Sequence, residues 1–230
     1  RALPNLLNAL ADVKGLEWIR LHYAYPSKFP LEVLDVIKNR SNVCNYLDMP
    51  LQHATDNMLK SMKRGITRKK SDELVDKIRQ TVPEIALRTT LISGFPGETI
   101  QDHEEMLKWV ESTRFDRLGV FPYSHEENTS AYSLKDDVPE EEKSRRAEEI
   151  MDLQAGISFE LNHEKVGKSY KVLFDRVEDD YFVGRTEFDS PEVDKEVLVS
   201  KKDNFVRIGD FADVKIIKAD NFDLYGILNK

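Results

Sequence analysis

Residues 85–97, Ile-Ala-Leu-Arg-Thr-Thr-Leu-Ile-Ser-Gly-Phe-Pro-Gly, contain the pattern that decides the fold of the first part of the chain. Apolar and β-branched side chains over 85–92 predict a buried strand. Gly and Pro within 93–97 predict a loop. Met106, Leu107 and Val110 then share one side of a predicted helix over 100–112. A strand, a short loop and a helix in this order are typical of an α/β fold.

The same alternation extends to both sides of this stretch. Strands are predicted over 18–23, 44–49, 85–92 and 118–121, and helices over 3–13, 31–39, 56–62, 71–81 and 100–112. Short connections between them indicate a parallel sheet, either in a barrel of the triose-phosphate kind or in an open doubly wound sheet. In such barrels the site lies at the carboxyl ends of the strands. No Gly-x-Gly-x-x-Gly follows a predicted strand, so a common dinucleotide site is not supported.

The pattern changes after Pro139. A long charged helix is predicted over 140–165, and Gly167 follows it. Beyond it, apolar residues recur with period two in short segments at 170–174, 182–184, 197–199, 214–217 and 224–227. These segments predict a small antiparallel barrel of about five strands. We therefore expect a partial α/β barrel over 1–138, a linker helix over 139–166 and a small all-β barrel over 167–230.

Composition narrows the classes of function. The 230 residues include 34 Lys and Arg against 42 Asp and Glu, a net charge of −8, which disfavours binding of duplex nucleic acid through a broad basic face. No apolar run approaches the ~18 residues of a membrane span. The single cysteine, Cys44, excludes an internal disulfide and a thiolate cluster built by this chain alone, and it fits a reducing cytoplasm. Because the sequence begins at Arg1, we expect it to start part-way through a longer chain.

Three motifs occur in the same order as in the methylthiotransferase family of radical S-adenosylmethionine enzymes. They are Trp18-Ile19-Arg20-Leu21 with Tyr25-Pro26, the stretch from Tyr46 to Thr55, and Leu91-Ile92-Ser93-Gly94-Phe95-Pro96-Gly97-Glu98. The chain resembles that family over essentially its whole length. The resemblance implies a partial radical SAM barrel followed by a TRAM domain, with S-adenosyl-L-methionine and [4Fe-4S] clusters as the cofactors of the parent enzyme.

Within the family, Pro50-Leu51-Gln52-His53 resembles the branch that thiomethylates an aspartate of small-subunit ribosomal protein S-twelve. The tRNA-modifying branch, which has Ser-Gly after the glutamine, remains the alternative. A further alternative of a different class is a TRAM module that binds RNA or protein on an inert scaffold. The cysteine loop that holds the family's cluster is missing from this chain, so the chain alone is expected to be inactive. Cys44 lies in a predicted strand and fits a buried packing role.

The resemblance implies a cofactor site formed by Gln52, Arg88, Ser93 and Gly94. The Gln52 amide can both donate and accept at a strand end, although a loop hydrogen bond is its alternative role. Arg88 within a buried strand requires an anionic partner, which a carboxylate of the cofactor or of the protein would supply. Ser93-Gly94 allows close approach of a flat adenine, and a simple turn is the alternative. No metal ligand is assigned.

Three residues are candidates to face the substrate. His53 follows Gln52, and packing against the next loop is an equally supported role for it. Tyr123 and His125 follow the fourth predicted strand, where a solvated loop is the alternative. No residue is assigned as catalytic.

The predicted small barrel is acidic. Residues 164–230 contain 12 Lys and Arg against 15 Asp and Glu, a net charge of −3. The aromatic residues Tyr181, Phe182 and Phe188 stand among Asp and Glu, which repel phosphates and attract basic protein segments. We therefore expect a basic ribosomal protein, S-twelve, or the small ribosomal subunit as the partner rather than tRNA. No membrane partner is expected.

Overall fold

The computed structural model describes residues 2–202 and 204–229 and consists of two compact units. The first unit ends at Gln154 and the second begins at Ala155. This division falls inside helix α6 (Glu140–His163), within the segment that the sequence predicts as a linker helix. None of the helices in the described ranges is both long and apolar enough to cross a bilayer.

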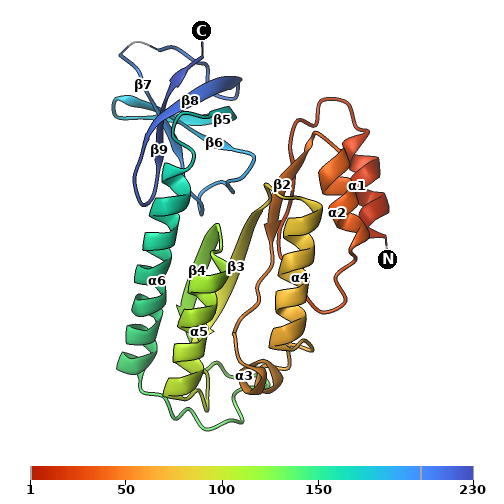
Figure 1. Ribbon diagram of the computed structural model, residues 1–230, viewed down its shortest axis with the longest axis vertical. Coiled ribbons are helices and arrows are strands. Elements are labelled where there is room, and N and C mark those ends of the chain that lie inside the picture. Colours follow the sequence, from red (N-terminus) through yellow and green to blue (C-terminus); the bar gives the residue numbers. More distant parts are fainter. Residues whose placement is uncertain (1, 203, 230) are drawn as a thin grey trace. The chain divides into compact units, whose positions relative to one another are not determined.

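The first unit is a four-stranded parallel sheet with helices between the strands (Figure 1). The strands are β1 (Ile19–Leu21), β2 (Val43–Asp48), β3 (Ala86–Ser93) and β4 (Arg117–Pro122). The helices are α1 (Leu3–Ala11), α2 (Glu32–Asn39), α3 (Asp56–Ser61), α4 (Arg68–Thr81) and α5 (Ile100–Thr113). The strands lie in sequence order, β1-β2-β3-β4, and every pair is parallel. This order is that of a barrel, because a doubly wound sheet reverses its strand order at a switch point.

Burial in β3 shows that the two faces of the sheet differ. Leu87, Thr89 and Leu91 are fully buried, whereas the alternating residues Arg88 and Thr90 are only half-buried. Helices α4 and α5 lie in front of the strands in Figure 1, and their apolar sides are buried. Helices therefore cover one face of the sheet. The other, which we call the open face, carries Arg88 and the residues beside it on neighbouring strands.

The second unit is a closed five-stranded barrel with the strand order β5-β6-β7-β9-β8. Its strands are β5 (Ser169–Glu178), β6 (Tyr181–Thr186), β7 (Val197–Ser200), β8 (Phe211–Ala219) and β9 (Leu224–Leu228). The predicted small barrel is thus confirmed, with one difference in detail: β7 and β9 pair in parallel. A closed ring of five strands cannot alternate direction throughout, because five is an odd number, so at least one pair must be parallel.

The last turns of α6 are bound to this barrel. The Ser158 hydroxyl donates to the carbonyl of Asn221 at 3.0 Å, and the Asn162 amide donates to the carbonyl of Asp220 at 2.9 Å. The Lys195 ammonium in turn donates to the Asn162 side chain. These contacts explain why the second unit begins within the helix rather than after it.

Gly184 of β6 allows a close approach of neighbouring strands in the barrel. A Cβ at this position would lie 2.5 Å from the carbonyl oxygen of Leu173 and 2.7 Å from Val172 Cγ1. We predict that Gly184→Ala destabilises the barrel by about 1–3 kcal/mol, the usual cost of overpacking. Native-state hydrogen exchange of the barrel amides measures this change. The control is Gly156→Ala in α6, where no atom lies within 4 Å of the added Cβ; equal destabilisation by both variants would contradict the prediction.

Candidate functional site

An ion pair between neighbouring strands marks the open face at the carboxyl end of β2. Asp48 and Arg88 are register partners, and Arg88 Nη1 lies 3.0 Å from Asp48 Oδ1. The side chain of Asp48 is 1% exposed and that of Arg88 is 19% exposed. The other carboxylate oxygen, Oδ2, accepts the backbone N–H of Tyr23 at 3.1 Å. One carboxylate therefore joins β2, β3 and the segment that follows β1.

Three more side chains surround this pair on the side of β1. His22 Nδ1 lies 3.9 Å from Asp48 Oδ2, and the His22 ring lies 5.7 Å from the ring of Tyr46. The Arg20 guanidinium lies over Tyr46, 5.1 Å from its ring centre. Arg20, His22 and Tyr46 therefore adjoin the Asp48–Arg88 ion pair.

Gln52 lies next to this cluster at the end of the sheet. Its backbone N–H donates to the carbonyl of Thr90, and its carbonyl accepts the N–H of Ile92, each at 2.9 Å. Its φ is 73°, an uncommon value for a residue other than glycine. The half-buried amide forms no hydrogen bond within the described residues. The structure thus places Gln52 beside Leu91 of β3, three positions along from Arg88, with its side-chain donors and acceptor unused.

Ser93 and Gly94 contact α6 instead. The Ser93 hydroxyl donates to the carbonyl of Lys143 at 2.9 Å, and Ser93 is fully buried. At Gly94, whose φ is +70°, a Cβ would lie 2.2 Å from Lys143 Cγ. The Ser93 side chain therefore lies on the covered face, away from Arg88, and its role in a cofactor site stays a prediction. The need for glycine at 94 follows from packing against the helix.

His53 belongs to a buried polar cluster centred on Glu98. Its Nδ1 accepts the backbone N–H of Thr55 at 3.1 Å, and its Nε2 lies 3.5 Å from Glu98 Oε2. That separation is an ion-pair distance, but the geometry of Nε2 does not satisfy a hydrogen bond. The imidazole is completely buried. This burial agrees with the packing alternative for His53, and its substrate-facing role stays a prediction.

Glu98 connects the loop after β3 to α6. Its Oε2 accepts the backbone N–H groups of Gly94 and Phe95 at 2.7 and 3.3 Å, and its Oε1 lies 2.8 Å from Arg146 Nη1. Burial raises the pKa of Glu98, but the adjacent imidazole of His53 and the hydrogen bond and charge of Arg146 outweigh this effect and hold the pKa below its usual value. The carboxylate is therefore ionised in the folded protein at neutral pH.

Tyr123 and His125 contact each other after β4. The Tyr123 hydroxyl lies 3.1 Å from His125 Nδ1, and the His125 ring stacks on Tyr132 at 4.7 Å. Tyr123 is buried against Phe95, with 5.1 Å between the rings, while His125 is half-buried. The structure thus brings these two residues together, but it packs Tyr123 beside the Ser93–Glu98 loop.

Asp48 is the residue of this site that the sequence interpretation missed. A carboxylate in a predicted buried strand is costly unless it is paired, so its presence before Met49-Pro50 was an available signal. Cys44, also on β2, is buried, as expected for a packing residue. Within the described ranges, no group of three or more His, Cys, Asp and Glu is placed to hold a metal ion.

Comparison with known proteins first defines the class of the two units. Residues 2–110 match the radical SAM superfamily, and residues 166–228 match the TRAM domain. Coproporphyrinogen III oxidase (HemN) from Escherichia coli, a radical SAM enzyme, superposes with a TM-score of 0.55 at 23% identity, covering 70% of this chain and 38% of that one. This likeness concerns the fold alone.

The curated relatives are more specific. The chain is 60% identical over 230 residues to the ribosomal protein uS12 methylthiotransferase RimO of Cytophaga hutchinsonii, covering 100% of this chain and 53% of that protein. It is 56% identical over 226 residues to RimO of Christiangramia forsetii, covering 98% of this chain and 50% of that protein. The chain thus spans about half the length of the curated relatives it matches. These matches confirm its assignment to the radical S-adenosylmethionine methylthiotransferase family.

The Glu98 cluster generates a test of stability against pH. We predict that Glu98→Gln lowers the free energy of unfolding by about 3 kcal/mol at neutral pH, because it leaves part of the charge of Arg146 uncompensated in a buried site. The loss should shrink as pH falls below the usual value of 4.5, since a depressed folded-state pKa stabilises the protein only while the carboxylate is ionised. Urea unfolding of the wild type and of Glu98→Gln over a series of pH values measures the difference in their free energies of unfolding.

The matched control is Glu104→Gln, because Glu104 is exposed on α5. It should leave the free energy of unfolding nearly unchanged at every pH. A difference between wild type and Glu98→Gln that stays constant from neutral to acidic pH would show that the charge of Glu98 is not the source of its effect.

Proposed function

We propose that this chain is part of a radical SAM methylthiotransferase that adds a methylthio group to an aspartate of ribosomal protein S-twelve. The observation that carries this proposal is the 60% identity to a protein named for that activity, along all 230 residues. The reaction class is a group transfer onto carbon, for which radical chemistry is supplied by the cofactor when it is bound. We propose a cytoplasmic location, because the substrate belongs to the ribosome.

The ion pair on the open face supports a place for S-adenosylmethionine. The methionyl end of this cofactor is a zwitterion, with an ammonium that suits Asp48 and a carboxylate that suits Arg88. The amide of Gln52 has unused donors and an acceptor at the adjoining end of the sheet, suited to hydroxyl or methionyl groups. These side chains fit the cofactor's polar groups, so Gln52 and Arg88 remain our proposed cofactor contacts.

The iron–sulfur cluster of the family does not fit this chain by itself. A [4Fe-4S] cluster needs several thiolates, and the chain has only Cys44, which is buried on β2. We therefore assign no step of the reaction to a cluster held by these residues. We propose that the 230 residues alone are inactive.

The tRNA-modifying alternative is distinguished by the product. We expect a protein that carries this chain at the length of its curated relatives to modify S-twelve, seen as a mass increase of one methylthio group replacing one hydrogen. Gln52→Ala should lower kcat/KM about tenfold, the effect of one lost hydrogen bond of ~1.4 kcal/mol. Gln80→Ala, an exposed glutamine on α4, is the control and should have no effect. Methylthiolation of tRNA adenosine without modification of S-twelve would overturn the assignment.

The second unit supports a basic protein partner. Asp179 and Asp180 are exposed at the turn between β5 and β6, next to the exposed Glu178. Phe182 is buried and Tyr181 and Phe188 are half-buried, so these aromatic side chains do not form the exposed platform that stacking on bases requires. The exposed aromatic residues among the described residues of the barrel are Phe205 and Phe222, whose exposed fractions are 78% and 73%.

We predict that the chain binds a Lys- and Arg-rich peptide of S-twelve and that salt weakens the binding. Asp179→Asn with Asp180→Asn should weaken it several-fold, as measured by titration calorimetry at low and physiological salt. The control is Asp213→Asn with Glu192→Gln, which removes the same charge from other exposed positions of the second unit. Equal loss in both double variants would indicate an effect of net charge and not a site at this turn.

A further inference from the structure

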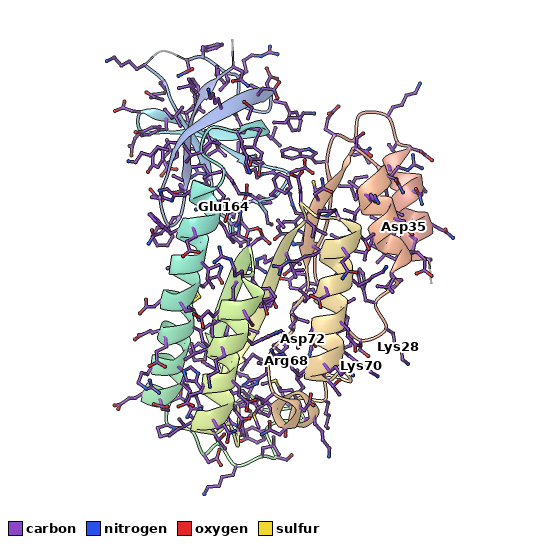
Figure 2. The ribbon with its side chains drawn as sticks, in the orientation of Figure 1. Lys28, Asp35, Arg68, Lys70, Asp72 and Glu164 are labelled. Atoms are coloured by element: carbon purple, nitrogen blue, oxygen red, sulfur yellow. The ribbon has the colours of Figure 1, made fainter. Side chains whose placement is uncertain are left out.

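Two adjoining hollows lie beside the first turns of α4 and form one groove. Their volumes are about 540 and 500 Å³, and Gly65, Ile66 and Lys70 line both. Five lysines line the combined groove, which we call the lysine groove: Lys28, Lys60, Lys63, Lys70 and Lys77. Figure 2 shows Lys28 and Lys70 next to each other at the end of α4 nearest α3.

The positive charge of the lysine groove is not neutralised within the described part of the chain. None of the five lysines has an ion pair there, and all five are exposed. Only two acidic residues line the groove, and both have partners. Asp56 accepts the backbone N–H of Arg68 at 2.6 Å, and Glu73 lies 3.9 Å from Lys69. In a chain of net charge −8, this is a local excess of cations.

Arg68, on the same helix as Lys70, differs from the groove lysines because its side chain has protein partners. Its guanidinium is bound to Asp72 at 2.9 Å and lies over the ring of Trp109, 4.9 Å from the ring centre. Arg68 and Asp72 are labelled together in Figure 2, away from Lys28. The guanidinium of Arg68 therefore has protein partners, while the side-chain ammonium of Lys70, two residues further on, has no ion pair in the described ranges.

The floor of the lysine groove is apolar. Phe29, Ile66 and Leu74 line it and are half-buried, so part of each side chain faces the groove. A ligand that fits must therefore present negative charges to a rim of lysines and apolar or aromatic faces to the floor. Lysine ammonium groups bind phosphates as point charges, and aromatic side chains accept the faces of unstacked bases.

We propose that the lysine groove binds a single-stranded segment of RNA, with phosphates on the lysines and at least one base on the floor beside Phe29. Duplex RNA fits less well because its bases are stacked and paired. An acidic peptide also carries negative charge. Its backbone N–H and C=O groups, however, would contact the apolar floor of the lysine groove without hydrogen-bond partners. This proposal does not rest on methylthiotransferase activity, because it concerns binding by the chain alone.

The test uses the 230-residue chain and a fluorescently labelled, unstructured oligoribonucleotide, with binding followed by anisotropy over a series of salt concentrations. Lys60→Gln, Lys63→Gln and Lys70→Gln together should weaken binding several-fold at low salt. They should also reduce the slope of log affinity against log salt by about 2, since each phosphate contact to a single strand contributes ~0.7. Phe29→Ala should weaken binding with no change in that slope.

The control combines Lys14→Gln, Lys38→Gln and Lys108→Gln, three exposed lysines outside the groove, so both triple variants have the same net charge. It should bind RNA as the wild type does. Equal loss in the two triple variants would overturn the proposal in favour of diffuse attraction. Tighter binding of poly-glutamate than of RNA, with the same dependence on the groove lysines, would also overturn it and assign the groove to an acidic protein.

Discussion

The first unit depends on the charge of one buried carboxylate, that of Glu98. Its oxygens accept two backbone N–H groups of the loop after β3 and bind Arg146 of α6, and His53 of the preceding loop lies beside it. Without that charge the two N–H groups would compete for a neutral acceptor, and the guanidinium would lose a partner in a dry environment. The loops at the carboxyl ends of β2 and β3 thus owe their relative positions to a group that is not itself on the open face.

Buried and half-buried polar residues lie close together in the segments that follow β2 and in and after β3. His53 and Glu98 are buried and hold the loops, whereas Gln52, one position before His53, and Arg88, near the start of β3, are half-buried. Gln52 is half-buried, whereas its neighbour His53 is completely buried. A motif of consecutive residues can therefore supply both a structural contact and a candidate ligand contact.

The positions of the strands and helices were largely predictable, because apolar periodicity within 85–97 and its counterparts is a local property of the chain. The hydrogen-bond and ion-pair partners of the polar residues were not predictable in this way. Arg88 was expected to need an anion, but nothing local identified Asp48, forty residues earlier, as that anion. The face on which Ser93 and His53 lie depends on the register of β3 with its neighbours and on the packing of α6. The parallel pair in the barrel likewise depends on contacts between segments far apart in sequence.

The parallel pairing of β7 with β9 also governs the order in which the second unit can form during synthesis. Strand β9 lies between β7 and β8 and closes the ring, and it is the last strand of the described residues. Until Leu224–Leu228 have left the ribosome, β7 and β8 keep unpaired edges, and the apolar side chains of the incomplete ring remain accessible. The first unit, built from successive strand–helix pairs in sequence order, has no such requirement. The nascent barrel is consequently exposed to mispairing for the whole interval in which its final strand is still being made.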